Sequence, residues 1–307
     1  MTPEFLVTHS GGFHADELLS SVLLTRLYPD AKLIRSRDAA WITPGPDRVI
    51  YDVGGIYDAE RQIFDHHQRG APLRDDGNPF SSFGLVWKHF GRCYLEALGL
   101  PAEQIDPMHA AFDRKFVLPI DLLDNGAISP SAAGPMADVT LPVLLETLKP
   151  TFDQRGEGVD DQAFFAAIPV ARAFVEGRIA QDAAKLRAEA VVMAAIERAG
   201  DCAVLELPAG MPFRAAIEKA GADHLLFVVH PRDGNDWCVT GIRRSDEGFA
   251  LRADLPAHWA GLTDAALEAA TGVPGAKFCH NARFIAAATT REAARALADL
   301  AVAEARA

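Results

Sequence analysis

The sequence predicts an α/β protein built around a mainly parallel β-sheet. In the first third of the chain, short apolar runs rich in β-branched and aromatic residues alternate with segments of helical periodicity. Two of these runs lead directly into His9 and Asp52, each of which is followed by a pair of glycines. Because parallel α/β sheets bind ligands at the carboxyl ends of their strands, these two positions are the first indication of a site.

Four strands and one helix are expected before residue 70. The apolar runs predict strands at residues 4–9, 31–38, 47–55 and 62–68. Residues 14–29 carry apolar side chains at helical spacing and predict a helix. Asp16 and Glu17 stand in its first turn, where acidic side chains suit the helix dipole.

The rest of the chain is expected to be helical at first and then richer in strands. Helical patterns occupy residues 81–100, 101–117, 160–199 and 290–307. Apolar runs that predict strands occupy residues 202–208, 224–231 and 237–244. The change near residue 200 predicts two domains, 1–199 and 200–307, with the long helix as a connector to the smaller α/β domain.

Composition narrows the class of protein. The chain has 307 residues, of which 49% are hydrophobic, and a net charge of −12. That charge argues against a broad basic surface that binds duplex DNA, although it does not exclude a local basic pocket. The four cysteines are far apart, which predicts reduced thiols. Neither a secretory signal nor an apolar run of about 20 residues is evident, so a cytoplasmic protein without a membrane partner is expected.

Histidines and acids gather beside the apolar runs, where charged groups are costly unless they are paired or bind a metal. The residues in question are His9, His14, Asp16, Asp52, Asp65, His66, His67, Asp121 and Asp124. Imidazole and carboxylate together suit Mn²⁺, Mg²⁺, Fe²⁺, Co²⁺ and Zn²⁺. With this many carboxylates, two metal ions could share a bridging acid, activate a water molecule and neutralise phosphoryl oxygens.

Two motifs favour a metal site. The segment "HSGGFHADE" lacks the spacing and the lysine of a nucleotide P-loop, so a loop that brings metal ligands together fits it better than a phosphate loop or an ordinary capped helix. In "FDHHQ", the adjacent His66 and His67 cannot point the same way on a regular strand. One is therefore expected to bind metal while the other faces the substrate or a supporting group; two histidines that only cap a loop are the alternative.

Phosphate oxygens would need cationic partners. Arg35, Arg37, His67 and Arg283 are candidates. Arginine binds phosphate through two parallel hydrogen bonds, which favours it in this role. The alternative for each arginine is an ordinary solvated surface charge.

Taken together, the motifs resemble the DHH superfamily of metal-dependent phosphoesterases, and more closely its melanocyte proliferating gene family. The matching motifs, in chain order, are "THSGGFHADE", "IRSRD", "YDVGG", "FDHHQ", "SSFGLVWKHFG", "IDLLDNG", "GVPGAKFCHNARFIA" and "TREAARALA". The resemblance implies a DHH-type N-terminal domain, a helical connector and a smaller C-terminal domain, with the active site in a cleft between the two domains.

The resemblance also implies roles for individual residues. The metal ligands would be His9, His14, Asp16, Asp52 as a bridging carboxylate, His66, and either Asp121 or Asp124, with Asp121 preferred. The catalytic pair would be Asp65, which orients, and His67, which contacts phosphate. His280 and Arg283 would bind substrate, although only Gly275 remains of the usual glycine run before the histidine.

The function expected from this reading is a two-metal phosphoesterase, a 3′–5′ exonuclease on RNA or short oligoribonucleotides. Two divalent ions are expected as cofactors, with Mn²⁺ preferred. The alternatives are a phosphatase acting on pyrophosphate, polyphosphate or a small nucleotide, and a metal-stabilised binding protein without turnover. Expected partners are RNA, an oligonucleotide or a small phosphate ester, and a homodimer is among the expected assemblies.

Overall fold

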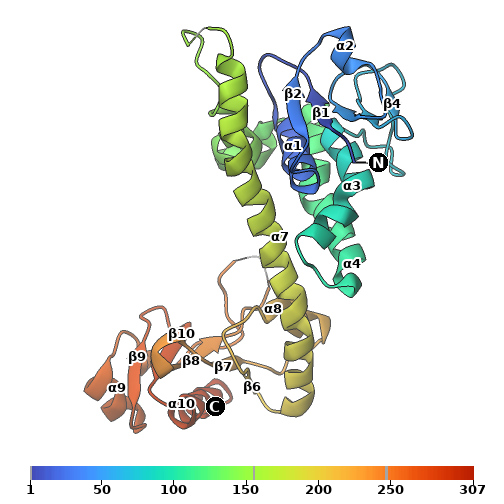
Figure 1. Ribbon diagram of the computed structural model, residues 1–307. Helices are drawn as coiled ribbons and strands as arrows, with labels where there is room; N and C mark the ends of the chain where they lie inside the picture. Colours follow the sequence, from blue (N-terminus) through green and yellow to red (C-terminus); the bar gives the residue numbers. More distant parts are fainter. Residues whose placement is uncertain (1, 155, 246–247) are drawn as a thin grey trace. The chain divides into compact units, whose positions relative to one another are not determined.

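Figure 1 shows the computed structural model of the chain, which describes residues 2–154, 156–245 and 248–307. The chain divides into two compact units, Met1–Ala183 and Ala184–Ala307. This division falls inside the long helix α7, Val159–Ala199, ahead of the predicted domain boundary between residues 199 and 200. No helix in the described part of the chain combines the length and apolarity needed to span a membrane.

The first unit is built on a five-stranded sheet with the order β2-β1-β3-β5-β4. Its strands are β1 (Phe5–Thr8), β2 (Lys32–Arg35), β3 (Arg48–Tyr51), β4 (Tyr57–Asp58) and β5 (Ile63–Phe64). Strands β2, β1, β3 and β5 run parallel, and β4 pairs antiparallel with β5. The predicted α/β class and the mainly parallel sheet are thus confirmed for this unit.

Helices flank this sheet. They are α1 (Ala15–Leu27), α2 (Ala39–Ile42), α3 (Ser82–Ala97), α4 (Ala102–Phe112), α5 (Leu118–Asp124) and α6 (Leu141–Glu146). A π-helical turn, Asp113–Val117, joins α4 to α5, and a 3₁₀ segment, Pro130–Val139, precedes α6. Helices α1 and α3 pack against each other, and every residue of α1 from Ala15 to Leu24 is buried. The acidic first turn of α1 therefore lies in the interior of the unit.

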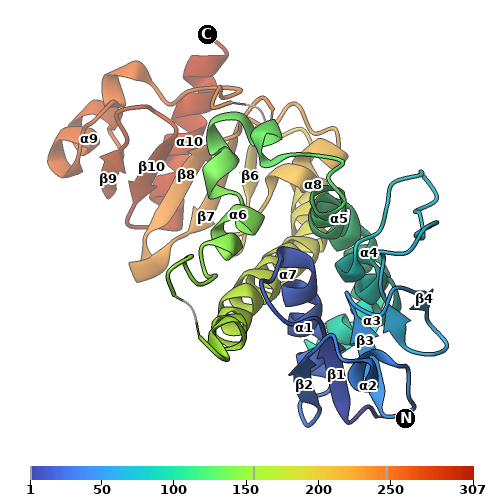
Figure 2. The ribbon, with the colours of Figure 1, turned by 90° about the horizontal axis from the view of Figure 1, so that it is seen from above.

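The second unit carries a separate sheet with the order β6-β7-β8-β10-β9, and Figure 2 shows its strands in this sequence. The strands are β6 (Val204–Glu206), β7 (Phe227–Pro231), β8 (Trp237–Gly241), β9 (Ala276–Cys279) and β10 (Ile285–Ala288). Only β6 and β7 pair in parallel, and the other pairs are antiparallel. This sheet is therefore mainly antiparallel, whereas the first is mainly parallel.

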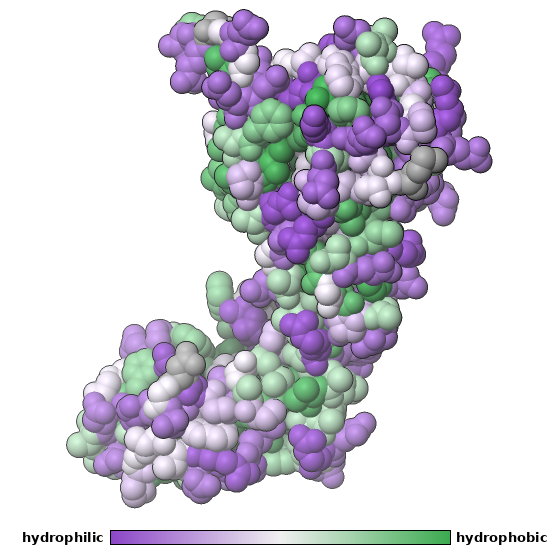
Figure 3. All heavy atoms as spheres, in the orientation of Figure 1, coloured by the Kyte–Doolittle hydropathy of each residue, from purple (hydrophilic) through white to green (hydrophobic). Residues whose placement is uncertain are grey.

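Besides the C-terminal part of α7, the described residues of the second unit form three further helices and two 3₁₀ turns. They are α8 (Arg214–Lys219), α9 (Asp264–Thr271), α10 (Arg291–Ala305) and the turns Asp233–Asn235 and Ala257–Trp259. The predicted strands within 202–208, 224–231 and 237–244 are present in shortened form. Strands β9 and β10 were not foreseen, because "AKFC" and "IAAA" contain little of the β-branched and aromatic content that marks a strand. In Figure 3 the viewed face of this unit is mostly hydrophilic or neutral in hydropathy.

Candidate metal centre

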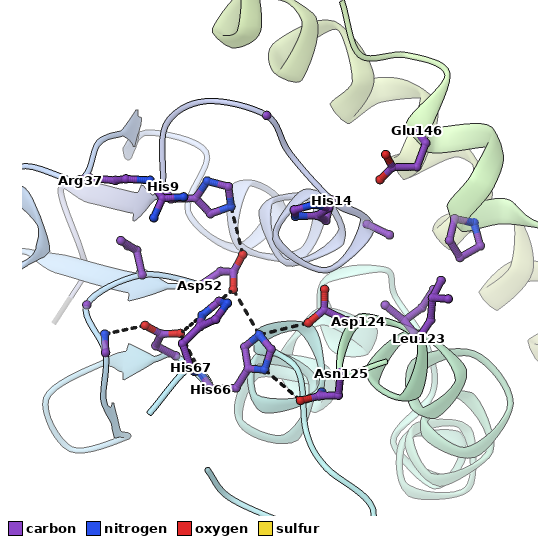
Figure 4. Close-up of a pocket in the computed structure, with 18 of the residues that line it drawn as sticks. His9, His14, Arg37, Asp52, His66, His67, Leu123, Asp124, Asn125 and Glu146 are labelled. Carbon is purple, nitrogen blue, oxygen red and sulfur yellow. Dashed lines mark hydrogen bonds and ion pairs between the residues drawn. The ribbon is translucent and has the colours of Figure 1, made fainter. Parts of the chain in front are cut away.

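Three parallel strands deliver the first polar groups of the site to one edge of the sheet. His9 follows β1, Asp52 follows β3, and the Asp65-His66-His67 triplet follows β5. Because β1, β3 and β5 are neighbours and run parallel, their carboxyl ends lie together. Figure 4 shows the side chains of His9, Asp52 and His66 turned toward one another. The strand ends therefore bring these three side chains together, as the sequence predicts.

Asp52 lies at the middle of the cluster. Its two carboxylate oxygens are 3.2 Å from Nε2 of His9 and 3.4 Å from Nε2 of His66, and the Ser82 hydroxyl donates to it at 3.2 Å. Its backbone adopts the left-handed conformation with φ of 54°, which is uncommon for a residue with a side chain. Such strain persists where the surroundings impose it and is concentrated at functional sites.

The buried first turn of α1 adds two carboxylates. Both oxygens of Asp16 are buried without a hydrogen-bond partner in the described residues, and one lies 3.9 Å from Nε2 of His66. Glu17 accepts the backbone N–H of His14 at 2.8 Å and lies 3.0 Å from Nε2 of His9. A buried carboxylate without a donor is costly unless a cation compensates it. Asp16 therefore points to a missing positive charge at this position.

Glu17 is a site residue that the sequence reading missed, because it was assigned only to the helix dipole. Its side chain is fully buried, and it groups with His9 and His14 as one possible ligand set. His14 itself is exposed at the rim of the site. The only available sequence signal was that Glu17 directly follows Asp16 in a segment already rich in ligand types.

The two acids of "DLLDNG" lie in different surroundings. Asp124 lies 3.1 Å from Nε2 of His66 and shares a group of candidate ligands with Asp16 and His66. Asp121, the preferred residue in the sequence analysis, is fully buried elsewhere and bonds Arg74 at 2.6 Å. Asp121 is therefore placed in a structural network outside the cluster, and Asp124 takes the position expected of a ligand.

The predicted catalytic pair is assembled beside the cluster. The Asp65 carboxylate accepts from Nδ1 of His67 at 2.7 Å and from the backbone N–H groups of Gly55 and His66. Burial alone would raise the pKa of Asp65, but these donors together lower it. The hydrogen bond that His67 donates to Asp65 raises the pKa of His67, which burial opposes. The His67 side chain is 61% exposed, so its remaining ring nitrogen is accessible to a ligand.

Without a cation, protons compensate the negative charge of the cluster. Burial lowers the pKa of His9, but the hydrogen bonds to Asp52 and Glu17 outweigh it and raise the pKa to about 10. Burial likewise opposes the effect of Asp124 and Asp52 on His66, whose pKa is also raised to about 10. Burial, followed by the neighbouring carboxylates, raises the pKa of Asp16.

The donor set fits divalent cations. Four overlapping groups each offer three ligand atoms within 4.8 Å of one another: His9-His14-Glu17, Asp52-His66-His67, Asp16-His66-Asp124 and Asp16-Glu17-Asp52. Imidazole and carboxylate donors without thiolates suit Mn²⁺, Mg²⁺, Fe²⁺, Co²⁺ and Zn²⁺. The donor set, the uncompensated Asp16 and the strained Asp52 are therefore all consistent with a divalent-metal centre.

The cluster opens into a cavity of about 1110 Å³ that lies wholly within the first unit. Arg37 and Asn125 line this cavity, and Glu146 from the end of α6 lies across it from His14 in Figure 4. Arg37 is exposed and has no charged partner in the described residues. It is therefore available to bind an anionic ligand beside the cluster.

Arg35, the other arginine predicted to bind phosphate in this segment, forms structural contacts away from the cavity. Its side chain is fully buried, bonds Asp161 at 2.7 Å, and donates to the carbonyl oxygen of Gly11. Its guanidinium also lies 4.4 Å from the centre of the Phe164 ring. Arg35 thus fixes the glycine loop against α7 and does not line the cavity.

The predicted substrate residues of the second unit lie in the turn between β9 and β10. His280 accepts the backbone N–H of Ala282 at 3.0 Å, and its ring lies 4.4 Å from that of Phe284. Arg283 has a left-handed φ of 57° and bonds Asp254 at 2.8 Å. The turn therefore holds the imidazole of His280 and the guanidinium of Arg283, which is paired with Asp254.

Metal binding is expected to release protons. At pH 7.5 a pKa of about 10 keeps His9 and His66 protonated in the metal-free protein, whereas a metal ligand must be a neutral imidazole. The apparent affinity for Mn²⁺ should therefore rise with pH, about tenfold per pH unit for each proton released. Titration calorimetry in buffers of different ionisation enthalpy measures this release, and heats that do not depend on the buffer would contradict it.

The fold and the cluster define the class: an α/β protein with a candidate divalent-metal centre at the carboxyl edge of a parallel sheet. The model of the "Uncharacterised protein family (UPF0160)", the MYG1 family, matches residues 5–302, and the chain belongs to this family. The resemblance to the melanocyte proliferating gene family is thereby confirmed.

Relatives in this family match nearly the whole chain. The chain is 30% identical to the MYG1 exonuclease of Homo sapiens over 332 residues, which cover 99% of this chain and 86% of that protein. It is 31% identical to the MYG1 protein C694.04c of Schizosaccharomyces pombe over 316 residues, 95% of each chain. No solved structure matches the chain.

Proposed function

We propose that the chain is a metal-dependent phosphodiesterase of the DHH type that hydrolyses RNA or short oligoribonucleotides from the 3′ end. The observation that carries the proposal is the buried cluster of imidazoles and carboxylates around Asp52, with the uncompensated Asp16 beside it. The human relative is named an exonuclease, which supports a nucleic-acid substrate. We further propose that the protein works in the cytoplasm and that a homodimer is its assembly.

The proposed centre holds two divalent ions, with Mn²⁺ preferred. Its ligands would be drawn from His9, His14, Asp16, Glu17, Asp52, His66 and Asp124. When bound, the ions would activate the attacking water and neutralise charge on the phosphate oxygens. Asn125, 3.4 Å from Nδ1 of His66, supports the orientation of that ring.

The remaining polar groups would act on the substrate. Asp65 holds His67 by its Nδ1, so the other ring nitrogen can donate a proton or a hydrogen bond to a phosphate oxygen. Arg37 would bind a further phosphate oxygen from the cavity wall. We propose that His280 and Arg283 contribute substrate contacts from the second unit, for which Arg283 would exchange its bond to Asp254 for a phosphate.

Asp65→Asn is expected to shift the alkaline limb of the rate–pH profile toward lower pH. The bond to the Asp65 carboxylate raises the pKa of His67, so protonated His67 persists to a higher pH in the native protein. Asparagine removes that charge and lowers the pKa, so the protonated form is lost earlier as the pH rises. Profiles of kcat/KM for both proteins measure the shift, and superimposable alkaline limbs would exclude this role for His67.

Substrate length separates the leading proposal from its nearest rival. The net charge of −12 gives the chain little attraction for long RNA, and a cavity of about 1110 Å³ suits a short oligonucleotide or a small phosphate ester. The purified protein should release mononucleotides from a 3′-labelled and a 5′-labelled oligoribonucleotide with Mn²⁺, and the labels reveal the direction. Cleavage of pyrophosphate or polyphosphate without attack on oligoribonucleotides would identify the protein as a phosphatase and contradict the exonuclease proposal.

A matched pair of variants ties the reaction to the centre. His66→Ala should abolish nucleotide release, whereas His258→Ala should not, because His258 is exposed in the second unit and belongs to none of the ligand groups. Tight Mn²⁺ binding without hydrolysis of any substrate in the panel would instead identify a metal-stabilised binding protein.

A further inference from the structure

The second unit contains a cavity that the proposed function does not use. Its volume is about 440 Å³, and it lies within Ala184–Ala307, where α7 ends and α10 begins. The chemically distinctive residues of its lining are Arg198, Cys202, Glu206, Trp237, Arg291 and Arg295. Three guanidinium groups and an indole in one cavity are unusual in a chain whose net charge is −12.

The sheet and the helix place these residues together. Glu206 is the last residue of β6, and it lines the cavity together with Leu207 and Pro208, which follow it in the chain. Trp237 begins β8 and pairs with Ala288 at the end of β10. Arg291 is the first residue of the 15-residue helix α10. A helix N-terminus favours anionic ligands, and the arginines strengthen that preference.

The charges of the lining are only partly neutralised. Arg291 forms two hydrogen bonds to Glu206, one of them at 3.0 Å. Arg295 bonds Asp299 at 3.0 Å. Arg198 is exposed and has no ion-pair partner in the described residues. Within the lining itself, three guanidinium groups therefore face one carboxylate, that of Glu206; Asp299 and Glu292, which pair with Arg295 and Arg291, lie outside the lining.

We propose that this cavity binds a nucleoside monophosphate, separately from the metal centre. Arg198 and Arg291 would bind the phosphate, for which paired hydrogen bonds from guanidinium groups are well suited. The indole of Trp237 is partly buried against the core of this unit and forms part of the cavity wall, where a nucleobase can stack on it. The phosphate would compete with Glu206 for Arg291.

Titration of the full-length protein with AMP, inorganic phosphate and adenosine tests the proposal. A chelator is present throughout, so the metal centre does not contribute. AMP is expected to bind at one site, to quench tryptophan fluorescence, and to bind more tightly than phosphate or adenosine. Equal affinities for AMP and phosphate would overturn the nucleotide assignment, because the base would then add nothing.

Variants assign the binding to this cavity. The double variant Arg198→Ala/Arg291→Ala should weaken AMP binding at least about tenfold through the loss of charge-assisted hydrogen bonds. Glu206→Gln should strengthen it, because Arg291 loses its competitor. Arg306→Ala is the matched control, since Arg306 is exposed just beyond the other end of α10. Unchanged affinity in the double variant would overturn the proposal.

Two further variants test whether AMP binds in this cavity or in the metal centre. Trp237→Phe should keep most of the AMP affinity, because phenylalanine also stacks, and should lose the fluorescence quench. His66→Ala should leave AMP binding unchanged. Binding that disappears with His66→Ala would place the nucleotide in the metal centre and overturn the second site, whatever the outcome of the hydrolysis assays.

Discussion

Replacing Asp52 by asparagine is expected to lower kcat/KM for Mn²⁺-dependent hydrolysis by at least about a thousandfold. Such a loss corresponds to about 4 kcal/mol of transition-state stabilisation, within the range that a metal centre supplies. Asp52 is the carboxylate that both His9 and His66 contact, so no neighbouring acid can replace it at the same position. Assays on an oligoribonucleotide with saturating Mn²⁺ measure the loss.

Asparagine is chosen because it tests the charge and spares the backbone. Asp52 has a φ of 54°, a conformation that asparagine tolerates and alanine does not. Asp106→Asn serves as the control, because Asp106 is an exposed acid on α4 that bonds Arg92 and lies outside the candidate ligand groups of the described residues. If Asp52→Asn retained activity within tenfold of the native protein while Asp106→Asn behaved as native, Asp52 would be excluded as a ligand.

The part of the site that sequence predicts well is the part built on strand ends. An apolar run followed by a polar residue identifies where a buried strand stops, and parallel pairing then brings His9, Asp52 and His66 together without further information. Both steps depend on local sequence and on a general property of α/β sheets. For this reason the three residues could be placed in one cluster before the structure was known.

The helical contributions were harder to predict, and α1 shows why. Amphipathic spacing normally separates a buried face from a solvated one, but here every residue from Ala15 to Leu24 is buried. An acid in the first turn is therefore not at the surface, where a role in the helix dipole would be sufficient. Glu17 was missed because burial of all faces of a helix depends on tertiary packing and leaves no periodic signal.

The two acids of α5 show a second limit. The sequence predicts an uninterrupted helix through residue 117, whereas the chain makes a π-helical turn over Asp113–Val117 before α5 begins. A π turn inserts an extra residue per turn and rotates everything that follows. Which of Asp121 and Asp124 faces the cluster depends on that rotation, so spacing alone could not decide between them.

Asp121→Ala is expected to have the largest effect on stability. The buried carboxylate accepts hydrogen bonds from Arg74 at 2.6 Å, from the Ser81 hydroxyl at 2.7 Å and from the Gly84 N–H at 3.0 Å. Burial raises the pKa of Asp121 to about 6, against the opposing effect of Arg74, so the group is ionised at pH 8. Breaking a buried ion pair there should lower the free energy of unfolding by about 3–5 kcal/mol.

Asp124→Ala provides the contrast that separates the two acids. Asp124 is partly exposed and contacts His66, so its loss should change the free energy of unfolding of the metal-free protein by about 1 kcal/mol or less. It should nevertheless weaken Mn²⁺ binding and hydrolysis strongly, whereas Asp121→Ala should bind Mn²⁺ with near-native affinity where it remains folded. Urea unfolding at pH 8 with chelator, paired with Mn²⁺ titration, measures both effects. If the two variants exchanged these outcomes, Asp121 would be the ligand and Asp124 the structural residue.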